Sequence, residues 1–474
     1  MVINFFIVSI LLAGAAFLIK NRNVNHLLVM AHSLFTLYLT IYEFRHLGEI
    51  QAVYFRADSL SIIFLTVLSL VTFMSSLHYT SYTVRGEVPM SFVNIHNFST
   101  ILFNTAIVGV LLAAHFGVLW AMIELTTLTA AMLIQHDRNE TSMEATWKYL
   151  FVCSIAITIA FAGVLFLGIA TQEAQSFDFS FDSIKSVASI LDPNWTKACF
   201  LFVLTGFSVK MGLVPMFNVD IDAKDVSPSP VGAKLSSILV NAGFVSIYRF
   251  YEVFSGTEIH QWMNRVIIIT AIISLFFAAV YMLKVRNIKR LLAYSSMEHA
   301  ALAMLAFASG GIGYFAAVFH LVLHSLIKSS IFFQIGQLHN VFGSKLDIDI
   351  KDYLKVNPVG GLVLLTGFCS IIALPPSGMF ISEFLIFQSI FESHRFWLLA
   401  LSFLLLLFII YGMGSRLLTI IFNDDDTGHK PNTKNARIGE SLVQLGVIVA
   451  VFYIGFFKPT FIVNMIQTAV QTLP

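Results

Sequence analysis

Residues 316–333 read AAVFHLVLHSLIKSSIFF, a helix-length apolar stretch that nevertheless carries two histidines and a lysine. Three further apolar stretches hold one ionisable residue near the middle: Glu124 in 117–134, Lys210 in 200–217 and Glu383 in 373–391. An ionisable group in the hydrocarbon core of a membrane costs about 3 kcal/mol or more, so it is normally retained because something must bind or move there. The simplest species that such groups move is a proton.

The composition is that of an integral membrane protein. Hydrophobic residues make up 57% of the 474 positions and charged residues 12%, whereas soluble proteins average about 45–50% and about 25%. The net charge of +1 creates no global field that would attract nucleic acid. The three cysteines are scattered, with no CxxC pair, so we expect this chain to hold neither an iron–sulfur cluster nor a structural zinc ion of its own.

The length of the apolar runs predicts about fourteen membrane spans, since a crossing helix needs about 20 residues. They are expected at 2–19, 25–46, 58–80, 99–114, 116–135, 148–171, 198–220, 230–254, 263–284, 290–309, 314–339, 358–392, 396–422 and 438–460. Lys and Arg are roughly twice as frequent in one set of alternate loops, which by the positive-inside rule is cytoplasmic. That set includes Lys284, Arg286, Lys430 and Lys434, and it places both chain termini outside. The polar stretch 173–197 on the outer side is expected to form a small surface helix.

Prolines fall within two of these spans, each close to the ionisable residue. Pro215 lies in 198–220, and Pro375, Pro376 and Gly378 lie in 358–392. Proline removes a backbone donor and clashes with the carbonyl one turn earlier, so each site predicts a kink or an unwound stretch. Two interrupted spans are typical of transporters with internal repeats. The alternative is that each proline produces a harmless kink.

An ordered set of motifs gives the chain a family resemblance. The strings are KMGLVPMF (210–217), PSPVGAKLSS (228–237), NIKRLLAYSSMEHA (287–300), FHLVLHSLIKSSIFF (319–333) and LPPSGMFISEF (374–384), supported by RADSLSIIF (56–64) and WKYLFVCS (147–154). Together they resemble the proton-translocating, antiporter-like membrane subunits of respiratory complex I, Mrp sodium/proton antiporters and energy-converting membrane hydrogenases. Among these branches, AYSSMEHA, LPPSGMFISEF and EATWKYL are most similar to the large antiporter-like component F of hydrogenase-4 and formate hydrogenlyase complexes.

The resemblance implies an all-α polytopic membrane protein of fourteen helices. Helices 4–8 and 9–13 would form two inverted five-helix repeats, with helices 7 and 12 broken. The corresponding division is 1–97 for helices 1–3, 98–256 and 257–422 for the two repeats, and 423–474 for the C-terminal helix region. The chain would lie in a bacterial cytoplasmic membrane beside other membrane and peripheral subunits of a redox complex. Iron–sulfur and NiFe centres would then belong to those partner subunits.

The resemblance also assigns roles to three of the ionisable residues. Glu124 matches the helix-5 glutamate of the family, Lys210 the helix-7 lysine and Glu383 the helix-12 exit residue. A neighbouring carboxylate favours the ammonium form of a buried lysine, so movement of Glu124 would change the proton affinity of Lys210. The alternative is a static buried salt bridge that holds helices together.

His320, His324 and Lys328 stand at i, i+4 and i+8, so they share one helix face that rises about 12 Å. Histidine titrates near neutral pH, and a stack of two can pass protons through intervening water. In the family these positions form the polar axis of the second half-channel, while packing histidines are the alternative. HxxxH spacing can also indicate a metal, but the sequence shows no third ligand or HExxH pattern, so no metal site is expected.

Other positions are accessory candidates or depart from the family pattern. Glu298 and His299 follow the SSM string, which predicts a turn, and resemble a branch-specific polar pair; an interfacial pair is the alternative. After the helix-7 lysine, relatives commonly have two histidines and a proline, whereas 217–224 reads FNVDIDAK, a predicted charged loop that includes Asp222. Asn241 replaces a helix-8 lysine of several paralogues, and Lys234, two turns earlier on the same face, is the candidate substitute. Asp58 is expected to cap a helix rather than to relay protons.

These observations predict a proton-translocating subunit of a group 4 NiFe-hydrogenase or formate hydrogenlyase complex, without a redox centre of its own. Lys210 would release a proton through Lys234, His324 and Lys328 towards Glu383. Three alternatives remain open: a complex I or Mrp-type subunit in which sodium is the ion, the membrane partner of an inorganic-carbon uptake system, and a purely structural membrane anchor.

Overall fold

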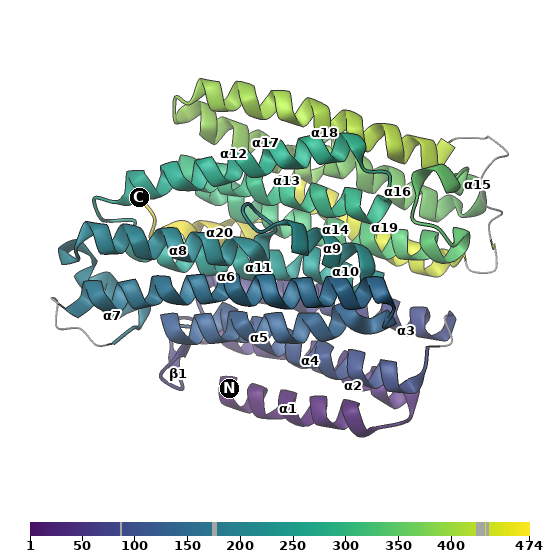
Figure 1. The fold of residues 1–474 in the computed structure, drawn as a ribbon, viewed down its shortest axis with the longest axis horizontal. Helices are drawn as coiled ribbons and strands as arrows, with labels where there is room; N and C mark the ends of the chain where they lie inside the picture. The colour runs from purple at the N-terminus through teal and green to yellow at the C-terminus, as the bar shows by residue number, and fades with distance from the viewer. Residues whose placement is uncertain (86–87, 173–177, 423–431, 433–435) are drawn as a thin grey trace. The chain divides into compact units, whose positions relative to one another are not determined.

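The computed structural model describes residues 1–85, 88–172, 178–422, 432 and 436–474. Within these ranges the chain is built from α-helices, with short 3-10 turns and one two-stranded hairpin of β1 (Ile50–Gln51) and β2 (Phe55–Arg56) (Figure 1). The all-α fold class is therefore confirmed. The 3-10 turns are η1 (Gln135–Asp137), η2 (Ala188–Ile190) and η3 (Asp347–Asp349). Lys430 and Lys434, two of the residues that predict which loops are cytoplasmic, lie outside the described residues.

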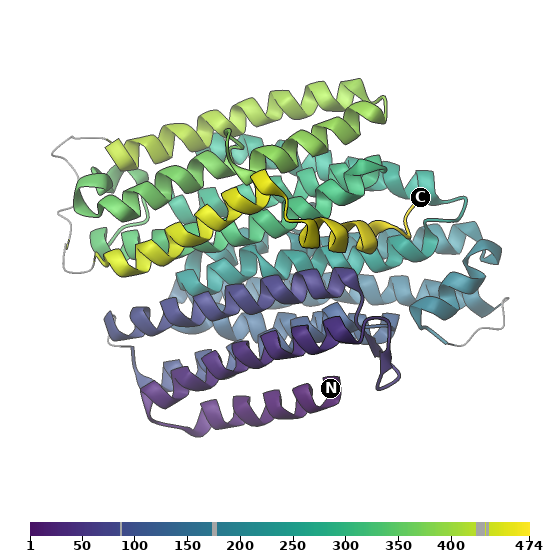
Figure 2. The ribbon, with the colours of Figure 1, turned by 180° about the vertical axis from the view of Figure 1, so that it is seen from behind.

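Contacts divide the chain into two compact units. The first comprises Met1–Ser227, Ile238–Thr270 and Asn464–Pro474, and the second Pro228–Ser237 and Ala271–Val463. The helices of the first unit are α1 (Val2–Leu18), α2 (Arg22–Arg45), α3 (Ser59–Arg85), α4 (Met90–Leu112), α5 (Phe116–Ile134), α6 (Glu140–Gln172), α7 (Phe181–Val187), α8 (Pro193–Met211), α9 (Asn218–Val226) and α11 (Ile238–Phe254). Helices α1 to α4 pack against one another at its N-terminal end (Figure 2).

The second unit holds α10 (Ser229–Ser236), α13 (Ile288–Ser309), α14 (Ile312–Phe342), α15 (Tyr353–Val356), α16 (Pro358–Ile371), α17 (Gly378–Glu392), α18 (Phe396–Phe422) and α19 (Ile438–Phe457). Two helices, α12 (His260–Lys284) and α20 (Thr460–Val470), cross the boundary between the units. Helix α14 packs against α10, α13 and α17, so it forms the centre of this unit.

Small residues decide which helices approach most closely. A Cβ on Gly206 of α8 would lie 2.4 Å from the backbone oxygen of Ala156 in α6, and a Cβ on Gly455 of α19 would lie 2.0 Å from the Cα of Gly378 in α17. Glycine lets two backbones come together at such positions, as it does between membrane helices generally. Gly378, predicted as part of a helix break, is therefore also a packing residue.

Eleven helical segments among the described residues are long and apolar enough to cross a membrane, and α1, α16 and α20 are shorter apolar helices. Each predicted span overlaps a helix, but three starts are wrong: α4 begins at Met90 rather than 99, α6 at Glu140 rather than 148, and α8 at Pro193 rather than 198. Hydropathy misses these turns because they are polar. The first turn of α6 is nonetheless capped, since Asn139 Oδ1 accepts a hydrogen bond from the Ser142 backbone N–H at 2.7 Å. The total of fourteen spans and the inverted repeats remain predictions.

Both predicted helix interruptions are present. Helix α8 ends at Met211, the chain turns through Gly212 with φ of +68°, and α9 begins at Asn218. Helix α16 ends at Ile371 and α17 begins at Gly378, where Ser377 caps it by accepting from the Phe380 N–H. A third interruption, at Ser237 between α10 and α11, was not predicted. In the predicted surface segment 173–197, the described residues 178–197 form α7, η2 and the first residues of α8.

An ion pair ties the start of α3 to α11 within the first unit. Asp58 accepts from the Ser61 backbone N–H at 2.8 Å, which confirms its capping role, and from Arg249 Nη2 at 3.0 Å. Partial burial raises the pKa of the Asp58 carboxyl, whose side chain is 39% exposed, but the charge and hydrogen bonds of Arg249 outweigh it and lower the pKa to about 2. Because the pKa is lowered, the stabilisation is fully present at neutral pH and is lost only as the pH falls through about 2.

We expect Asp58→Asn to lower the free energy of unfolding by about 1–3 kcal/mol, because it removes the closer of the two carboxylates beside the buried Arg249 guanidinium and leaves only Glu252 Oε2, which lies 3.6 Å from Arg249 Nη1. The melting temperature of the purified protein in detergent measures the effect. Asp182→Asn is the matched control, since the Arg56–Asp182 pair has side chains 28% and 62% exposed and should contribute at most about 1 kcal/mol. Equal losses in the two variants would contradict this account.

Candidate functional site

The first cluster of buried charges centres on Lys210, in the last turn of α8. Its Nζ donates to the Thr127 hydroxyl oxygen on α5 at 2.6 Å, and the Thr127 hydroxyl in turn donates to Glu124 Oε2 at 3.4 Å. Lys210 is 1% exposed and Thr127 is fully buried, while Glu124 is half-buried. Glu124 and Lys210, which the resemblance paired, are therefore neighbours joined through a hydroxyl group.

Helix α6 supplies the remaining partners of this cluster. Ser154 donates from its hydroxyl to Glu124 Oε1 at 3.0 Å, and the Lys210 ammonium lies 5.5 Å from the centre of the Tyr149 ring. A cation near an aromatic face is attracted by the negative potential of the ring. Thr127, Ser154 and Tyr149 were not predicted from the sequence. Hydroxyl-bearing residues are common on membrane helices. The sequence does not show which face of α5 or α6 is turned towards Lys210, so these three could not be singled out.

The stretch 217–224 is not the charged loop that was predicted. It forms most of α9, in which Lys224 Nζ and Asp220 Oδ2 make an ion pair at 2.5 Å with side chains 0% and 2% exposed. The loop prediction was wrong because a carboxylate and an ammonium at i and i+4 neutralise each other on one helix face, which allows the helix to be buried. Asp222 is half-buried on the same helix. The i, i+4 spacing of Asp220 and Lys224 is the feature of the sequence that could have predicted this helix.

Asp220 is also near enough to attract the Lys210 ammonium. The cluster thus contains two carboxylates, Glu124 and Asp220, and two ammonium groups, Lys210 and Lys224, which is balanced in charge. The break between α8 and α9 creates this arrangement, because the chain must reverse over a few residues to bring Asp220 back beside the end of α8. A Cβ on Gly212 would lie 2.5 Å from Asp220 Oδ2.

We expect Gly212→Ala to lower the free energy of unfolding by about 2–4 kcal/mol, since it adds the strain of a left-handed backbone and a clash with the Asp220 carboxylate. Gly48→Ala is the control, because Gly48 also has a positive φ, +83°, but nothing lies within 4 Å of an added Cβ. That variant should cost only about 1–2 kcal/mol. Similar melting temperatures for both variants would show that the contact with Asp220 has no structural consequence.

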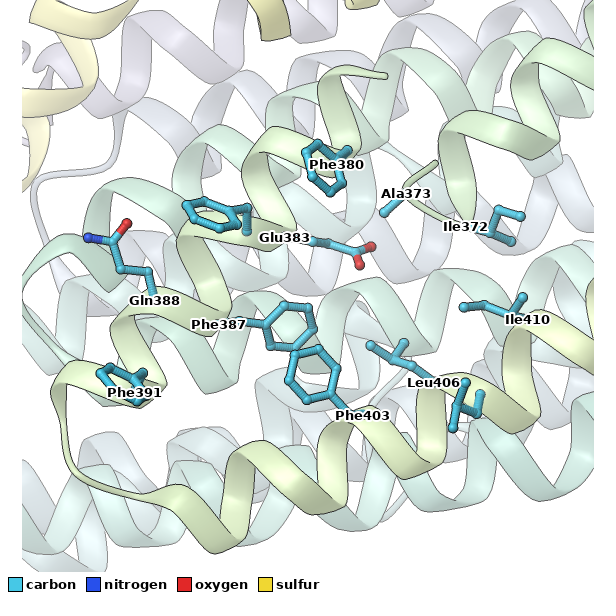
Figure 3. Close-up of a pocket in the computed structure, with 12 residues that line it drawn as sticks. Ile372, Ala373, Phe380, Glu383, Phe387, Gln388, Phe391, Phe403, Leu406 and Ile410 are labelled. Atoms are coloured by element: carbon cyan, nitrogen blue, oxygen red, sulfur yellow. The ribbon is translucent and has the colours of Figure 1, made fainter. Parts of the chain in front are cut away.

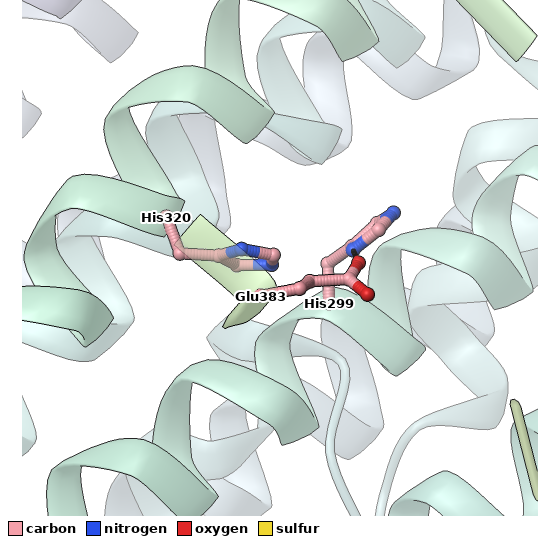
Figure 4. A group of neighbouring side chains, drawn as sticks. All are labelled: His299, His320 and Glu383. Atoms are coloured by element: carbon pink, nitrogen blue, oxygen red, sulfur yellow. Dashed lines mark ion pairs between the residues drawn. The ribbon is translucent and has the colours of Figure 1, made fainter. Parts of the chain in front are cut away.

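The second cluster lies in the second unit and joins three helices. His299 of α13, His320 of α14 and Glu383 of α17 each place one potential ligand atom within 4.8 Å of the others, and all three are buried (Figure 4). His299 Nδ1 is 3.8 Å from Glu383 Oε1, and the His299 ring centre is 5.2 Å from that of His320. The structure therefore brings together three residues from separate sequence motifs.

Three other predicted residues, His324, Lys328 and Glu298, lie beside His299 or contact its helix, α13. The His324 ring lies 5.1 Å from it, and Lys328 Nζ donates to the backbone oxygen of Leu292, also on α13, at 2.9 Å. Glu298 Oε2 lies 3.9 Å from His299 Nε2. The predicted face of His320, His324 and Lys328 thus packs against α13.

Two expectations about neighbouring residues are wrong. Glu298 and His299 do not follow a turn, since α13 is continuous from Ile288 to Ser309. The Ser296 hydroxyl donates within the helix to the Leu292 oxygen at 3.2 Å, so the serine string is accommodated without a turn. Nor do Lys234 and Asn241 share one continuous helix face, because the interruption at Ser237 leaves Lys234 on α10 and Asn241 on α11.

Glu383 also lines a cavity of about 650 Å³ between α17, α18 and the connection from α16 to α17, which contributes Ile372 and Ala373 (Figure 3). Apart from Glu383 and Gln388 its lining is apolar, with several phenylalanines, among them Phe380, Phe387 and Phe403. The Glu383 carboxylate is therefore reachable from this cavity while it faces His299.

Comparisons with known proteins agree with the fold. A family model described as NADH:quinone oxidoreductase/Mrp antiporter, TM, matches residues 113–409. The chain is 30% identical over 347 residues to a hydrogenase-4 component F homolog of Methylacidiphilum infernorum, covering 71% of this chain and 73% of that protein. It is 27% identical over 361 residues to hydrogenase-4 component B of Escherichia coli, covering 72% of this chain and only 51% of that protein. A chain of the archaeal membrane-bound sulfane sulfur reductase has the same fold, with a TM-score of 0.88 at 19% identity, over 100% of this chain and 97% of that one.

Proposed function

This chain belongs to the NADH:quinone oxidoreductase/Mrp antiporter transmembrane family, and from that membership we propose that it translocates protons as a subunit of a bacterial redox complex of the group 4 NiFe-hydrogenase or formate hydrogenlyase type. The similarity to a hydrogenase-4 component F homolog supports that branch. Other subunits would carry the redox centres, and this chain would supply the route for protons. The observation that carries the proposal is the hydrogen-bonded series Lys210–Thr127–Glu124.

A hydroxyl group between an ammonium and a carboxylate can pass a proton without moving far. Lys210 would give a proton to Thr127 Oγ1 as the Thr127 hydroxyl proton moves to Glu124 Oε2. The products are a neutral amine, an intact hydroxyl and a neutral carboxyl group. The Thr127–Glu124 distance of 3.4 Å must shorten for this step, because hydroxyl donors normally bond at about 2.7–2.8 Å.

Asp220 and Lys224 would control when that transfer occurs. An opposite charge nearby favours the charged form of a buried group, so Asp220 holds the proton on Lys210 while its carboxylate is turned towards it. If Asp220 turns fully to Lys224, that attraction falls and Lys210 releases its proton more readily. A conformational signal from a partner subunit needs only to move α9 to produce this change.

The second unit would supply the other half of the route. Lys234 lies on α10, which packs against α14, and is the proposed entrance; Lys328, His324 and His299 then lead to Glu383. The separations of 3.8 and 3.9 Å around His299 exceed hydrogen-bond length, so water or small side-chain movements would complete each step. Each proton moved against the membrane potential requires about 2.3 kcal/mol per 100 mV, which the redox partners must provide.

We expect Lys210→Met to lower proton uptake at least about tenfold in inside-out vesicles that hold the whole complex, since it removes the donor of the first transfer. A pH-sensitive dye measures uptake, and redox turnover is measured in parallel. Lys148→Met is the control, because that lysine is 51% exposed and pairs with Glu144 on the surface of α6. Full proton uptake by Lys210→Met in an assembled, active complex would refute the proposal.

The bridging hydroxyl gives a second test in the same vesicles. Thr127→Val keeps the side-chain shape but removes the hydroxyl, and we expect it to slow proton uptake by about tenfold or more. Thr129→Val is matched to it, because Thr129 is buried on the same helix but its hydroxyl donates to backbone oxygens of that helix, those of Leu125 at 2.8 Å and Thr126 at 3.3 Å. If both valine variants pump alike, the Thr127 hydroxyl does not carry the proton.

Sodium is the second candidate ion, because the matching family also includes Mrp antiporter subunits. Carboxylate oxygens such as those of Glu124 and Asp220 are suitable ligands for a hard cation. The vesicle assay separates the two ions. Proton uptake that persists when sodium is replaced by choline indicates protons, whereas uptake that requires sodium indicates exchange.

A further inference from the structure

We propose that His299, His320 and Glu383 form a binding site for a divalent transition-metal ion of the zinc class. This goes beyond proton translocation, because it assigns a ligand to the second cluster and does not depend on transport. The three potential ligand atoms lie within 4.8 Å of one another, and they come from three helices, α13, α14 and α17. In Figure 4 the His320 ring points towards Glu383 and His299. His299 and His320 are fully buried, and Glu383 is 6% exposed.

Hydrogen bonding determines which nitrogen of His320 is available. The Ser382 hydroxyl donates its hydrogen to the Met379 backbone oxygen at 2.9 Å, so the Ser382 oxygen must accept from His320 Nδ1, also at 2.9 Å. The proton of a neutral imidazole is therefore on Nδ1, and Nε2 carries a lone pair. Among the described residues His320 Nε2 has no hydrogen-bond partner. A metal-binding histidine is normally oriented in this way by a bond from its other nitrogen.

His299 and Glu383 present further buried polar atoms to the same place. Within the described parts of the chain, the two ring nitrogens of His299 have no hydrogen-bond partner. The same is true of Glu383 Oε1. A buried polar group without a partner costs about 1–3 kcal/mol, and several converging on one point call for a bound species. The 3.8 Å between His299 Nδ1 and Glu383 Oε1 is too long for a hydrogen bond. Two ligands of one tetrahedral zinc ion, each at about 2.0–2.2 Å, lie roughly 3.4 Å apart. The His299–Glu383 pair is close to that separation, and the other separations in the group, which reach up to 4.8 Å, must shorten by side-chain movement when the ion binds.

Charge and ligand type favour a zinc-class ion over other cations. Imidazole nitrogens suit zinc, cobalt and related metals, whereas magnesium and calcium prefer oxygen ligands. Glu383 and the adjacent Glu298 together balance the two positive charges, and Glu298 is placed to accept from His299 Nε2 if it moves closer than 3.9 Å. Lys328 opposes binding by its charge, but its Nζ is directed to the Leu292 oxygen. Glu383 also lines the cavity of about 650 Å³, from which a water could reach the ion as fourth ligand.

No metal site was expected from the sequence, because His320 and His324 lie on one helix and no third ligand is visible near them. In the structure only His320 of these two histidines belongs to the cluster. The other two potential ligands, His299 and Glu383, lie on α13 and α17. A metal here would occupy the lone pairs that the proposed proton route uses.

Metal binding is measured on the purified full chain in detergent. Cobalt(II) serves as the probe because four-coordinate cobalt has a characteristic visible absorption, and zinc is counted by mass spectrometry after dialysis. We expect one tightly held metal per chain, displaced by zinc but not by excess magnesium. Glu383→Gln and His299→Gln should each weaken cobalt binding at least about a hundredfold, and Ser382→Ala, which only orients His320, about tenfold.

His32→Gln is the matched control, because His32 is also fully buried, bonds one ring nitrogen to Ser9 at 3.0 Å and leaves the other without a partner among the described residues. It should bind cobalt like the wild type. Cobalt binding that survives Glu383→Gln and His299→Gln is adventitious and overturns the proposal, as does failure of the wild type to retain metal. Melting temperatures exclude misfolding, and Ser382→Ala tests the site without removing a ligand. Loss of proton uptake in Lys210→Met leaves all these results unchanged, so the two proposals fail independently.

Discussion

Charged groups buried among apolar helices must be neutralised locally, and this constraint governs the first cluster. An isolated ion moved from water into a low-dielectric interior loses many kcal/mol of hydration, and only close opposite charges and hydrogen bonds can offset that loss. Lys210 meets the requirement through Thr127, Glu124 and Asp220, and Asp220 in turn pairs with Lys224. The four charges balance, so a proton can shift within the group without creating a net buried charge.

The interrupted helices make that neutralisation possible. A continuous helix beyond Met211 would carry Asp220 away from Lys210 by about 1.5 Å per residue. The chain instead turns at Gly212, and α9 runs where Asp220 can pack against the glycine and face the end of α8. The break between α8 and α9 therefore places a second carboxylate, that of Asp220, beside the buried Lys210. It also makes α9 a short, separate helix, which in the proposed function is the element that a partner subunit moves.

The second cluster places polar groups in an apolar interior in a different way. Its members include atoms of His299, His320 and Glu383 without hydrogen-bond partners among the described residues. In the first cluster, by contrast, Lys210 is linked to Glu124 through the Thr127 hydroxyl, and Asp220 is paired with Lys224. Neutral imidazoles can be buried at lower cost than ions, so histidine allows a polar site that stays open to water, protons or a metal. Satisfied polar groups hold a structure rigid, and unsatisfied ones mark the place where something else binds.

Hydropathy determined that the chain is a membrane protein and where its approximate spans lie, the family motifs implied the all-helical fold, and the prolines predicted the interruptions near Pro215 and Pro376. All of these depend on properties of residues that are close together in the sequence. The motifs also placed Lys210, His320 and Glu383 among the candidates. Only the tertiary structure decided that Thr127 bridges Glu124 and Lys210, that 217–224 is mostly a buried helix, that α13 continues through Ser295, and that Ser237 separates Lys234 from Asn241. The physical reason is that a sequence records the polarity of each residue along its own helix. Whether a hydroxyl, a carboxylate or a helix break is stable depends on partners from helices far away in the chain, and packing alone selects those partners.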